Sequence, residues 1–212
     1  MVELFRIGYA PKQQGVPWIL RQIKDEKLLL KVGLLNRGED GQLYDPMEGR
    51  VVFPQVSPIG RYLGFVGRDI TSTRADKYLS TGSTPIFRRA EVLYRIDRAR
   101  QGIEQEQTAI VVEGLLDAAL MFQVGVKNVV ATGTKSMTDA QAQILSRYAK
   151  RIEVMFDNDP AGNAGYEDVR RRRGGHFHSV TKREYPSKFN DPADWVADRI
   201  DRAIMNQGAG VA

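Results

Sequence analysis

Short apolar runs alternate with longer amphipathic segments through the second half of the chain. The apolar runs predict four strands, at residues 109–112, 128–131, 152–156 and 176–181. The segments that follow them predict four helices, at residues 115–123, 139–149, 162–173 and 191–206. Alternation of strand and helix is typical of a mainly parallel sheet with helices on its faces, so we expect an α/β fold here.

The first half of the chain has shorter and less regular elements. Its pattern predicts strands at 4–10, 50–54 and 61–66, a short helix at 18–26 and a turn at 38–41. From Pro85 a helical repeat appears, and it leads into the polar stretch 101–107. We therefore expect three parts: an N-terminal α+β subdomain (1–107), an α/β domain (108–207) and a flexible tail (208–212).

Acidic side chains follow two of the predicted strands in the second half. Glu113 comes directly after the first apolar run, and Asp157 and Asp159 come after the third. Open α/β sheets bind ligands at the carboxyl ends of their strands, so we expect these carboxylates to meet at one edge. If Gly114 begins a helix, Asp117 points the same way as Glu113 across its first turn.

The chemistry of these acids indicates a divalent cation. A third acidic cluster, 190–194, follows the last predicted strand. Oxygen ligands without His or Cys suit Mg²⁺ or Mn²⁺, and the absence of cysteine excludes disulfides and thiolate zinc sites. Mg²⁺ keeps several waters and shares one or two carboxylates with substrate phosphates, so we expect it to be held loosely. Such sites suit phosphoryl or nucleotidyl transfer.

Composition and charge agree with a phosphate-bearing partner. The 212 residues are 42% hydrophobic, which is enough for a sizeable core, and they carry a formal charge of +5. A cationic cleft raises the local concentration of phosphate ligands. The longest apolar run, 109–122, is interrupted by Glu113 and Asp117, and residues 1–11 lack the pattern of a signal peptide. We expect no membrane partner and a cytoplasmic location.

Ordered motifs in both halves carry a specific resemblance. In the second half they are 110–117, 133–134, 155–162 and 191–192; in the first half they are 5–11, 49–54, 64–68, 77–80 and 86–94. The motifs of the second half resemble the Toprim domain, which bacterial-type primases share with some topoisomerases and nucleases. The motifs of the first half resemble the catalytic core of bacterial and phage DNA primases. The match runs from about residue 4 to about residue 200.

The resemblance implies an activity and a set of site residues. It places the acids of the metal site at Glu113, Asp157, Asp159 and Asp191, with Asp117 as a helper; the first three are the expected catalytic acids. It places the basic residues that handle template and incoming nucleotide at Arg68, Lys77 and Arg89. The implied reaction is synthesis of short RNA primers on single-stranded DNA by nucleotidyl transfer, with Mg²⁺ or Mn²⁺ and without zinc.

The implied partners are single-stranded DNA and ribonucleoside triphosphates, and the implied location is the cytoplasm of a bacterial or phage-infected cell. The zinc ribbon and helicase-contacting region of longer family members have no match in this sequence, so a separate zinc-ribbon subunit and a replicative helicase are further expected partners. Two alternatives stay open: a Toprim nuclease, and a nucleic-acid-binding primase subunit that is inactive without its partner. Each can be distinguished by assaying cleavage and synthesis separately.

The sequence departs from the family pattern at three places. Ala193 stands where the family often has a second acid, and Asp194 follows one residue later. Arg89 replaces a usual lysine, which keeps the charge but changes the donor geometry. Lys135 replaces the small residue that often follows the Gly-Thr pair.

Overall fold

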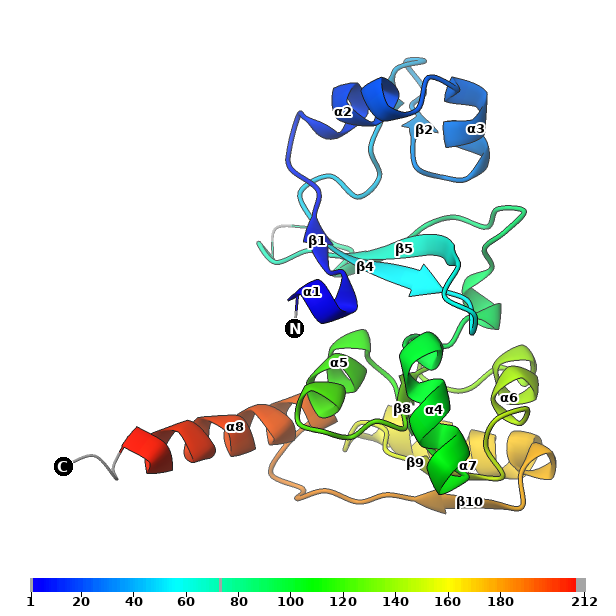
Figure 1. The fold of residues 1–212 in the computed structure, drawn as a ribbon, viewed down its shortest axis with the longest axis vertical. Helices are drawn as coiled ribbons and strands as arrows, with labels where there is room; N and C mark the ends of the chain where they lie inside the picture. Colours follow the sequence, from blue (N-terminus) through cyan, green and yellow to red (C-terminus); the bar gives the residue numbers. More distant parts are fainter. Residues whose placement is uncertain (1, 73, 209–212) are drawn as a thin grey trace. The chain divides into compact units, whose positions relative to one another are not determined.

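The computed structural model describes residues 2–72 and 74–208, and it divides into two compact units, residues 1–92 and 93–212 (Figure 1). Helix α4 (Ile96–Glu106) falls in the second unit, so this division comes before the boundary at 107/108 that the sequence suggests. Residues 209–212 of the expected tail lie outside the described residues.

An antiparallel sheet forms the centre of the first unit. Its strands run in the order β1 (Gly8–Tyr9), β4 (Val51–Val56), β5 (Tyr62–Arg68) and β6 (Tyr78–Ser80). The strands expected at 50–54 and 61–66 are confirmed as the β4–β5 pair, which sets Phe53 opposite Val66. Both side chains are buried, so the pairing is held by apolar contacts as well as by the ladder of hydrogen bonds.

Two expectations for the first unit are wrong. The strand expected at 4–10 is helix α1 (Val2–Phe5) followed by the two residues of β1. The single helix expected at 18–26 is two helices, α2 (Gly15–Gln22) and α3 (Glu26–Lys31). The chain is extended at Ile23, and the carboxylate of Asp25 accepts the N–H of Leu28 at 2.9 Å. That N-cap starts a new helix instead of continuing the old one.

The remaining elements of the first unit are short. The turn expected at 38–41 is confirmed, between β2 (Asn36–Arg37) and β3 (Leu43–Tyr44). The helical repeat expected from Pro85 gives only a short 3-10 helix, η1 (Arg89–Glu91), before α4 begins. The polar stretch 101–107 is not a break but lies largely within α4, whose apolar side is buried at Ile96, Ala99 and Ile103.

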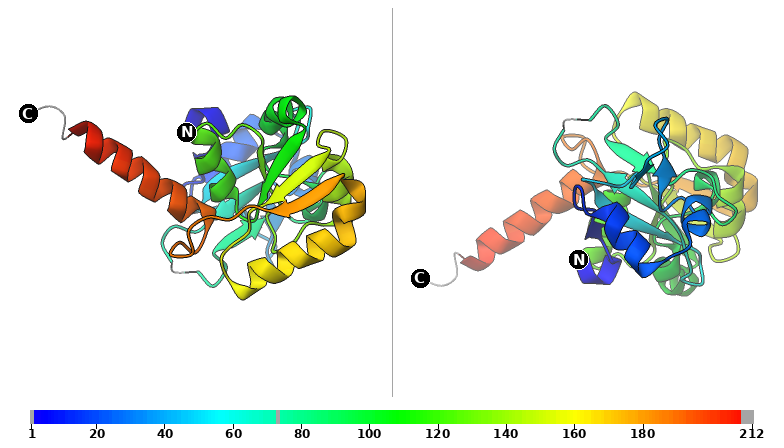
Figure 2. Two further views of the ribbon diagram at one scale, coloured as in Figure 1. Left: turned by 90° about the horizontal axis from the view of Figure 1, so that it is seen from below. Right: turned by 90° about the horizontal axis from the view of Figure 1, so that it is seen from above.

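A four-stranded parallel sheet forms the second unit, as the sequence predicts (Figure 2). Its order is β10 (Ser179–Lys182), β9 (Arg151–Val154), β7 (Thr108–Val112) and β8 (Val129–Ala131). Every pair in this sheet is parallel, so all four carboxyl ends lie along one edge. The last four residues of β7 are at most 2% exposed, because helices cover both faces of the sheet.

The helices of the second unit follow the expected order. They are α5 (Leu115–Gln123), α6 (Asp139–Leu145), α7 (Pro160–Arg173) and α8 (Pro192–Gly208). Buried side chains of α4, α6 and α7 form one cluster with alternate residues of β7 and β9, while α5 packs against α8. The expected strand 176–181 starts later, at Ser179, because residues 174–176 form a short 3-10 helix.

Within the described residues, no helix combines the length and the apolar character needed to cross a bilayer.

Candidate metal and nucleotide site

Glu113 lies at the carboxyl end of β7, and the backbone holds it in place. Its Oε1 accepts a hydrogen bond of 3.2 Å from the backbone N–H of Asp157, and its carbonyl oxygen accepts one of 2.9 Å from the N–H of Gly133. The ends of three strands therefore meet at this residue. Gly133 has φ +70°, in the left-handed region that favours glycine, which explains the Gly in the Gly-Thr pair.

Asp157 follows the neighbouring strand and carries an unusual oxygen. Its Oδ1 is buried and has no hydrogen-bond partner within the described part of the chain. A buried carboxylate oxygen without a donor is costly, and a bound cation would supply the missing partner. Burial, followed by the nearby charges of Asp191 and Asp159, raises the pKa of Asp157 to about 6.

The pKa values of Glu113 and Asp117 are raised as well. Burial, followed by the charge of Asp157, raises the pKa of Glu113 to about 7. Burial, followed by the charge of Asp191, raises the pKa of Asp117 to about 7. Several carboxylates are therefore close enough to disfavour one another's ionisation, and a divalent cation among them would relieve that repulsion.

The carboxylate of Asp117 connects the starts of α5 and α8. One carboxylate oxygen accepts the N–H of Gly114 at 2.9 Å, and the other accepts the N–H of Ala193 at 3.0 Å. Asp117 thus caps its own helix, α5, and also holds the first turn of α8. The expectation that Glu113 and Asp117 share the first turn of one helix is wrong, because Gly114 is the N-cap and Glu113 precedes the helix.

Asp159 and Asp191 lie at the starts of two helices. Asp159 accepts the N–H of Gly162 at 2.6 Å and is the N-cap of α7. Asp191 accepts the N–H of Asp194 at 2.8 Å just before α8. Each carboxylate has a second oxygen that these bonds do not use.

The donor set fits a hard divalent cation that also binds substrate. All candidate ligands are carboxylates, and the buried Oδ1 of Asp157 faces no donor of the described chain. Among residues 2–72 and 74–208, however, no three acidic or histidine side chains are placed to hold an ion by themselves. The arrangement therefore offers pairs, such as Glu113 and Asp157, and leaves the other coordination positions to water and phosphate.

Lys135, in the loop after β8, is a cation whose charge acts on this site. Its side chain is exposed, and its positive charge lowers the pKa of both Glu113 and Asp157. The loop is held against α7, since a Cβ at Gly165 would overlap the carbonyl oxygen of Lys135. Lys135, one of the three departures from the family pattern, is thus close enough to act on Glu113 and Asp157.

The three basic candidates all belong to the first unit. Arg68 ends β5 opposite Tyr78, and its guanidinium lies 5.5 Å from the centre of that ring. Lys77 directly precedes β6 and is exposed. Arg89 is exposed on another segment, in η1. Arg68 and Tyr78 place a cation beside an aromatic ring, a combination found on surfaces that bind single strands.

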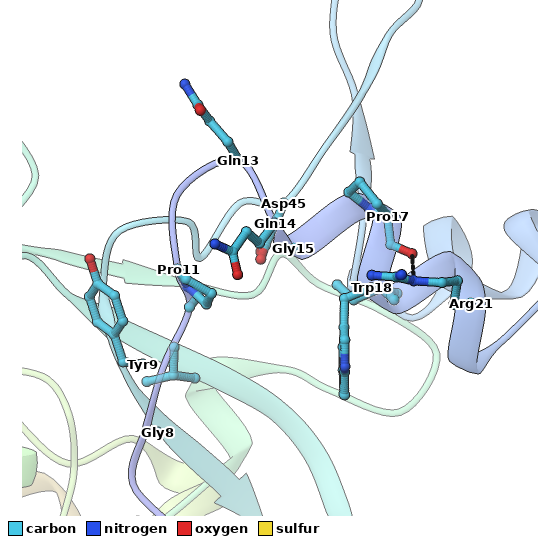
Figure 3. Close-up of a pocket in the computed structure, with 13 residues that line it drawn as sticks. Gly8, Tyr9, Pro11, Gln13, Gln14, Gly15, Pro17, Trp18, Arg21 and Asp45 are labelled. Atoms are coloured by element: carbon cyan, nitrogen blue, oxygen red, sulfur yellow. Dashed lines mark hydrogen bonds between the residues drawn. The ribbon is translucent and has the colours of Figure 1, made fainter.

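The first unit also contains a cavity of about 730 Å³. Figure 3 shows Tyr9 from β1 and Trp18 and Arg21 from α2 around it. Tyr9 and Trp18 are 54% and 58% exposed, which is unusual for large aromatic side chains. The sequence-based choice of basic residues did not include this cavity, because its lining comes from segments with no charge pattern.

Two models of known protein families match the chain, one in each half. The model of the DNA primase catalytic core, N-terminal domain, matches residues 1–100, and the Toprim-like model matches residues 110–196. The two matches follow one another in the order that the motifs predict. The chain belongs to the catalytic-core family of bacterial DNA primases.

Relatives in this family match nearly the whole chain. The DNA primase of Deinococcus radiodurans is 37% identical over 99% of the chain, which covers 37% of the relative. The structure of the Aquifex aeolicus primase, with zinc-binding and RNA polymerase domains, has a TM-score of 0.85 and 28% identity, and the match covers 97% of the chain and 52% of the relative.

A further solved structure is a DnaG primase catalytic domain bound to single-stranded DNA. It has a TM-score of 0.77 and 27% identity, and the match covers 97% of the chain and 66% of that domain. The primase family and the α/β fold expected from the sequence are therefore confirmed. The chain spans about a third of the length of the curated primases it matches.

The sequence did not point to two residues that contact the acidic segments. Tyr185 donates its hydroxyl hydrogen to carbonyl oxygens next to Asp157 and Asp191, and Asn158 donates to the same region. Asn158 lies within the motif 155–162 but was given no role there, and Tyr185 lies in none of the motifs. A lone tyrosine in a loop gives no signal until the backbone atoms around it are known.

Proposed function

We propose that this chain is the catalytic part of a DNA primase, which joins ribonucleotides into short RNA primers on single-stranded DNA. The proposal is supported by the two family matches and by the solved relatives. The observation that carries it is the pair of Glu113 and Asp157, linked by one hydrogen bond at the carboxyl edge of a parallel sheet, with a buried carboxylate oxygen left without a donor.

In the proposed reaction, the 3′ hydroxyl of one bound ribonucleotide attacks the α-phosphate of the next, and pyrophosphate leaves. Glu113 and Asp157 would hold Mg²⁺ or Mn²⁺, and Asp159 and Asp191 supply further carboxylate oxygens beside them. When bound, the cation neutralises charge on the phosphates and aligns the reacting oxygens. Asp117 keeps α5 and α8 in place so that the acids stay at this edge.

The basic residues have a separate role in this proposal. Arg68 and Lys77 bind the phosphates of the template, and Arg89 adds a third cation on the same unit. Tyr78, beneath the guanidinium of Arg68, offers a ring on which a base can stack. Phosphate contacts release counterions, so affinity for single-stranded DNA should fall steeply as salt rises.

The decisive experiment removes the two acids and measures synthesis. Dinucleotide formation from ribonucleoside triphosphates on single-stranded DNA is followed with Mn²⁺ for wild type, for Glu113→Gln with Asp157→Asn, and for Glu167→Gln. Glu167 is an exposed acid on α7 that pairs with Arg170, so its change is the matched control. We expect loss of product in the double variant alone. Wild-type synthesis by the double variant would remove these acids from the mechanism.

A zinc-binding partner is a further part of the proposal. The Aquifex aeolicus relative combines zinc-binding and RNA polymerase domains, and the match covers 52% of it. We propose that a zinc-binding domain supplied in trans raises synthesis by this chain. The test is the same dinucleotide assay with and without that domain; an unchanged rate would contradict the partner while leaving the catalytic proposal intact.

A further inference from the structure

Tyr185 lies between β10 and α8, and its hydroxyl reaches two backbone carbonyls at once. It is 3.2 Å from the carbonyl oxygen of Phe156 and 2.9 Å from that of Asn190. Phe156 directly precedes Asp157, and Asn190 directly precedes Asp191. One phenol group thus lies between the two segments that carry these carboxylates.

The shared hydroxyl joins the two segments through one buried group. A phenol has one hydrogen to donate, so the two carbonyl oxygens share it, and the connection holds only while both segments stay beside the ring. Asn158 adds two parallel bonds: its N–H donates to Asn190 at 2.8 Å and its side-chain amide to Phe189 at 3.0 Å. Together these bonds fix the distance between the segments.

The ring of Tyr185 is itself held in place. It is 8% exposed and stacks on Trp195 of α8, with ring centres 6.1 Å apart and an angle of 23° between the planes. The guanidinium of Arg199 lies over the ring of Trp195, 5.5 Å from its centre. The first turn of α8 is in turn fixed by Asp117 through the N–H of Ala193. The hydroxyl therefore has a defined position.

The connection works against a repulsion. Asp157 and Asp191 carry like charges on these two segments, so two ionised carboxylates push the segments apart. A cation that binds both needs them close before it arrives, since an ion gains little if it must first pull the backbone together. A neutral donor between the carbonyls supplies that closeness without adding charge.

We propose that Tyr185, helped by Asn158, is a positioning residue that holds Asp157 and Asp191 at the spacing at which they bind a divalent cation. This inference rests on the proposed function, because it concerns the same acidic site. Tyr185 touches neither substrate nor metal in this role. It acts through the backbone of the residues that precede the two acids.

The test compares Tyr185→Phe with Tyr148→Phe. Phenylalanine keeps the ring against Trp195 and removes only the hydroxyl. Tyr148 packs against the same core, just before β9 and thus at the opposite edge of the sheet, so it is the matched control. Mn²⁺ binding is measured by titration calorimetry on the full chain with a ribonucleoside triphosphate present. We expect Mn²⁺ affinity to fall about ten-fold in Tyr185→Phe and to stay at the wild-type value in the control.

A second readout separates positioning from stability. In the dinucleotide assay, the Mn²⁺ concentration for half-maximal rate should rise about ten-fold in Tyr185→Phe, while the rate at saturating Mn²⁺ returns toward wild type. Simple destabilisation would lower the unfolding temperature and leave that concentration unchanged. If Tyr185→Phe does not fold, Asn158→Ala removes one of the parallel bonds and must raise the same concentration.

Each outcome decides the matter. Equal Mn²⁺ affinity in wild type and Tyr185→Phe overturns the positioning role and leaves the proposed function standing. An equal loss in Tyr148→Phe also overturns it, because the effect would then not depend on the shared hydroxyl. Wild-type protein that binds no Mn²⁺ with nucleotide present overturns both the positioning role and the proposed metal site.

Discussion

The backbone N–H of Asp157 donates a 3.2 Å hydrogen bond to Oε1 of Glu113, across the parallel strands β9 and β7. This bond lowers the pKa of Glu113, whereas burial and the charge of Asp157 raise it. Burial and the charge of Asp157 together outweigh the hydrogen bond, so the pKa of Glu113 is raised to about 7. The pair is therefore held together by the backbone while its charges repel, which has consequences for stability.

Without divalent cations, the free energy of unfolding should fall as pH rises from about 4 to 7. The pKa values of Glu113 and Asp117 are raised to about 7, and that of Asp157 to about 6, from ordinary values of 4.5 and 3.8. In this range the folded state binds more protons than the unfolded state, so a higher pH favours unfolding. Urea unfolding across this range checks the sign; stability that rises toward pH 7 would contradict it.

Mg²⁺ should reverse this loss, and most strongly at pH 7 and above. Binding to the folded state alone stabilises by mass action, and the acids must be ionised to bind. The unfolding temperature should thus rise more on adding Mg²⁺ at high pH than at pH 5, and chelation should remove the gain. The variant Glu113→Gln with Asp157→Asn is the control, and an equal gain in it would place the ion elsewhere.

Replacing Asp117 by alanine should weaken the second unit. Asp117→Ala leaves the N–H groups of Gly114 and Ala193 without their carboxylate acceptors, and we expect a loss of roughly 2 kcal/mol. Hydrogen exchange at these two amides should accelerate, because both ends of the brace open. Asp194→Ala, an exposed acid in the first turn of α8, is the control. Unchanged exchange at Ala193 would contradict the brace.

The close approach at Gly162 gives a steric prediction. A Cβ there would overlap the carbonyl oxygen of Asp157 and lie 2.9 Å from its N–H nitrogen. Alanine normally favours a helix over glycine by up to about 1 kcal/mol, so a net loss of stability in Gly162→Ala reports the clash. We expect that loss together with reduced synthesis. Gly175→Ala, with nothing within 4 Å of the added atom, should be close to wild type in both.

Lys135 should set the acid limb of the rate profile. Its charge lowers the pKa of Glu113 and Asp157, so Lys135→Ala should raise both and move the rise in synthesis rate to higher pH. Lys150→Ala is the matched control, since Lys150 is exposed just before β9, at the opposite edge of the sheet. A profile that shifts equally in both variants would point to net charge instead of position.

The sequence predicted the second unit well for a physical reason. Strands such as β7 are buried on both faces, and the helices between them bury one side, so each leaves a clear period in the apolar residues. The first unit has shorter elements. At 4–10 and 18–26, local hydrogen bonds such as the Asp25 cap decided the outcome, and an apolar pattern does not record them.

The same difference separates the site residues. The closeness of Glu113 and Asp157 could be predicted because parallel strands bring their carboxyl ends together, whatever the loops do; their role in the site stays a prediction. Tyr185 could not, because its contacts are with carbonyl groups whose direction depends on the irregular segment before α8. Lys135 was visible only as a departure from the family pattern. Its distance from the acids depends on how the loop after β8 folds back against α7.

The double use of Asp117 matters to anyone who shortens this chain for spectroscopy. A version ending before Pro192 would keep every strand of the parallel sheet. It would lose the backbone N–H of Ala193, which donates to one oxygen of the buried Asp117 carboxylate. That oxygen would then have to find water or take up a proton, and α5 would lose part of its anchor. Truncations that retain the opening turn of α8 should therefore give the better-behaved samples.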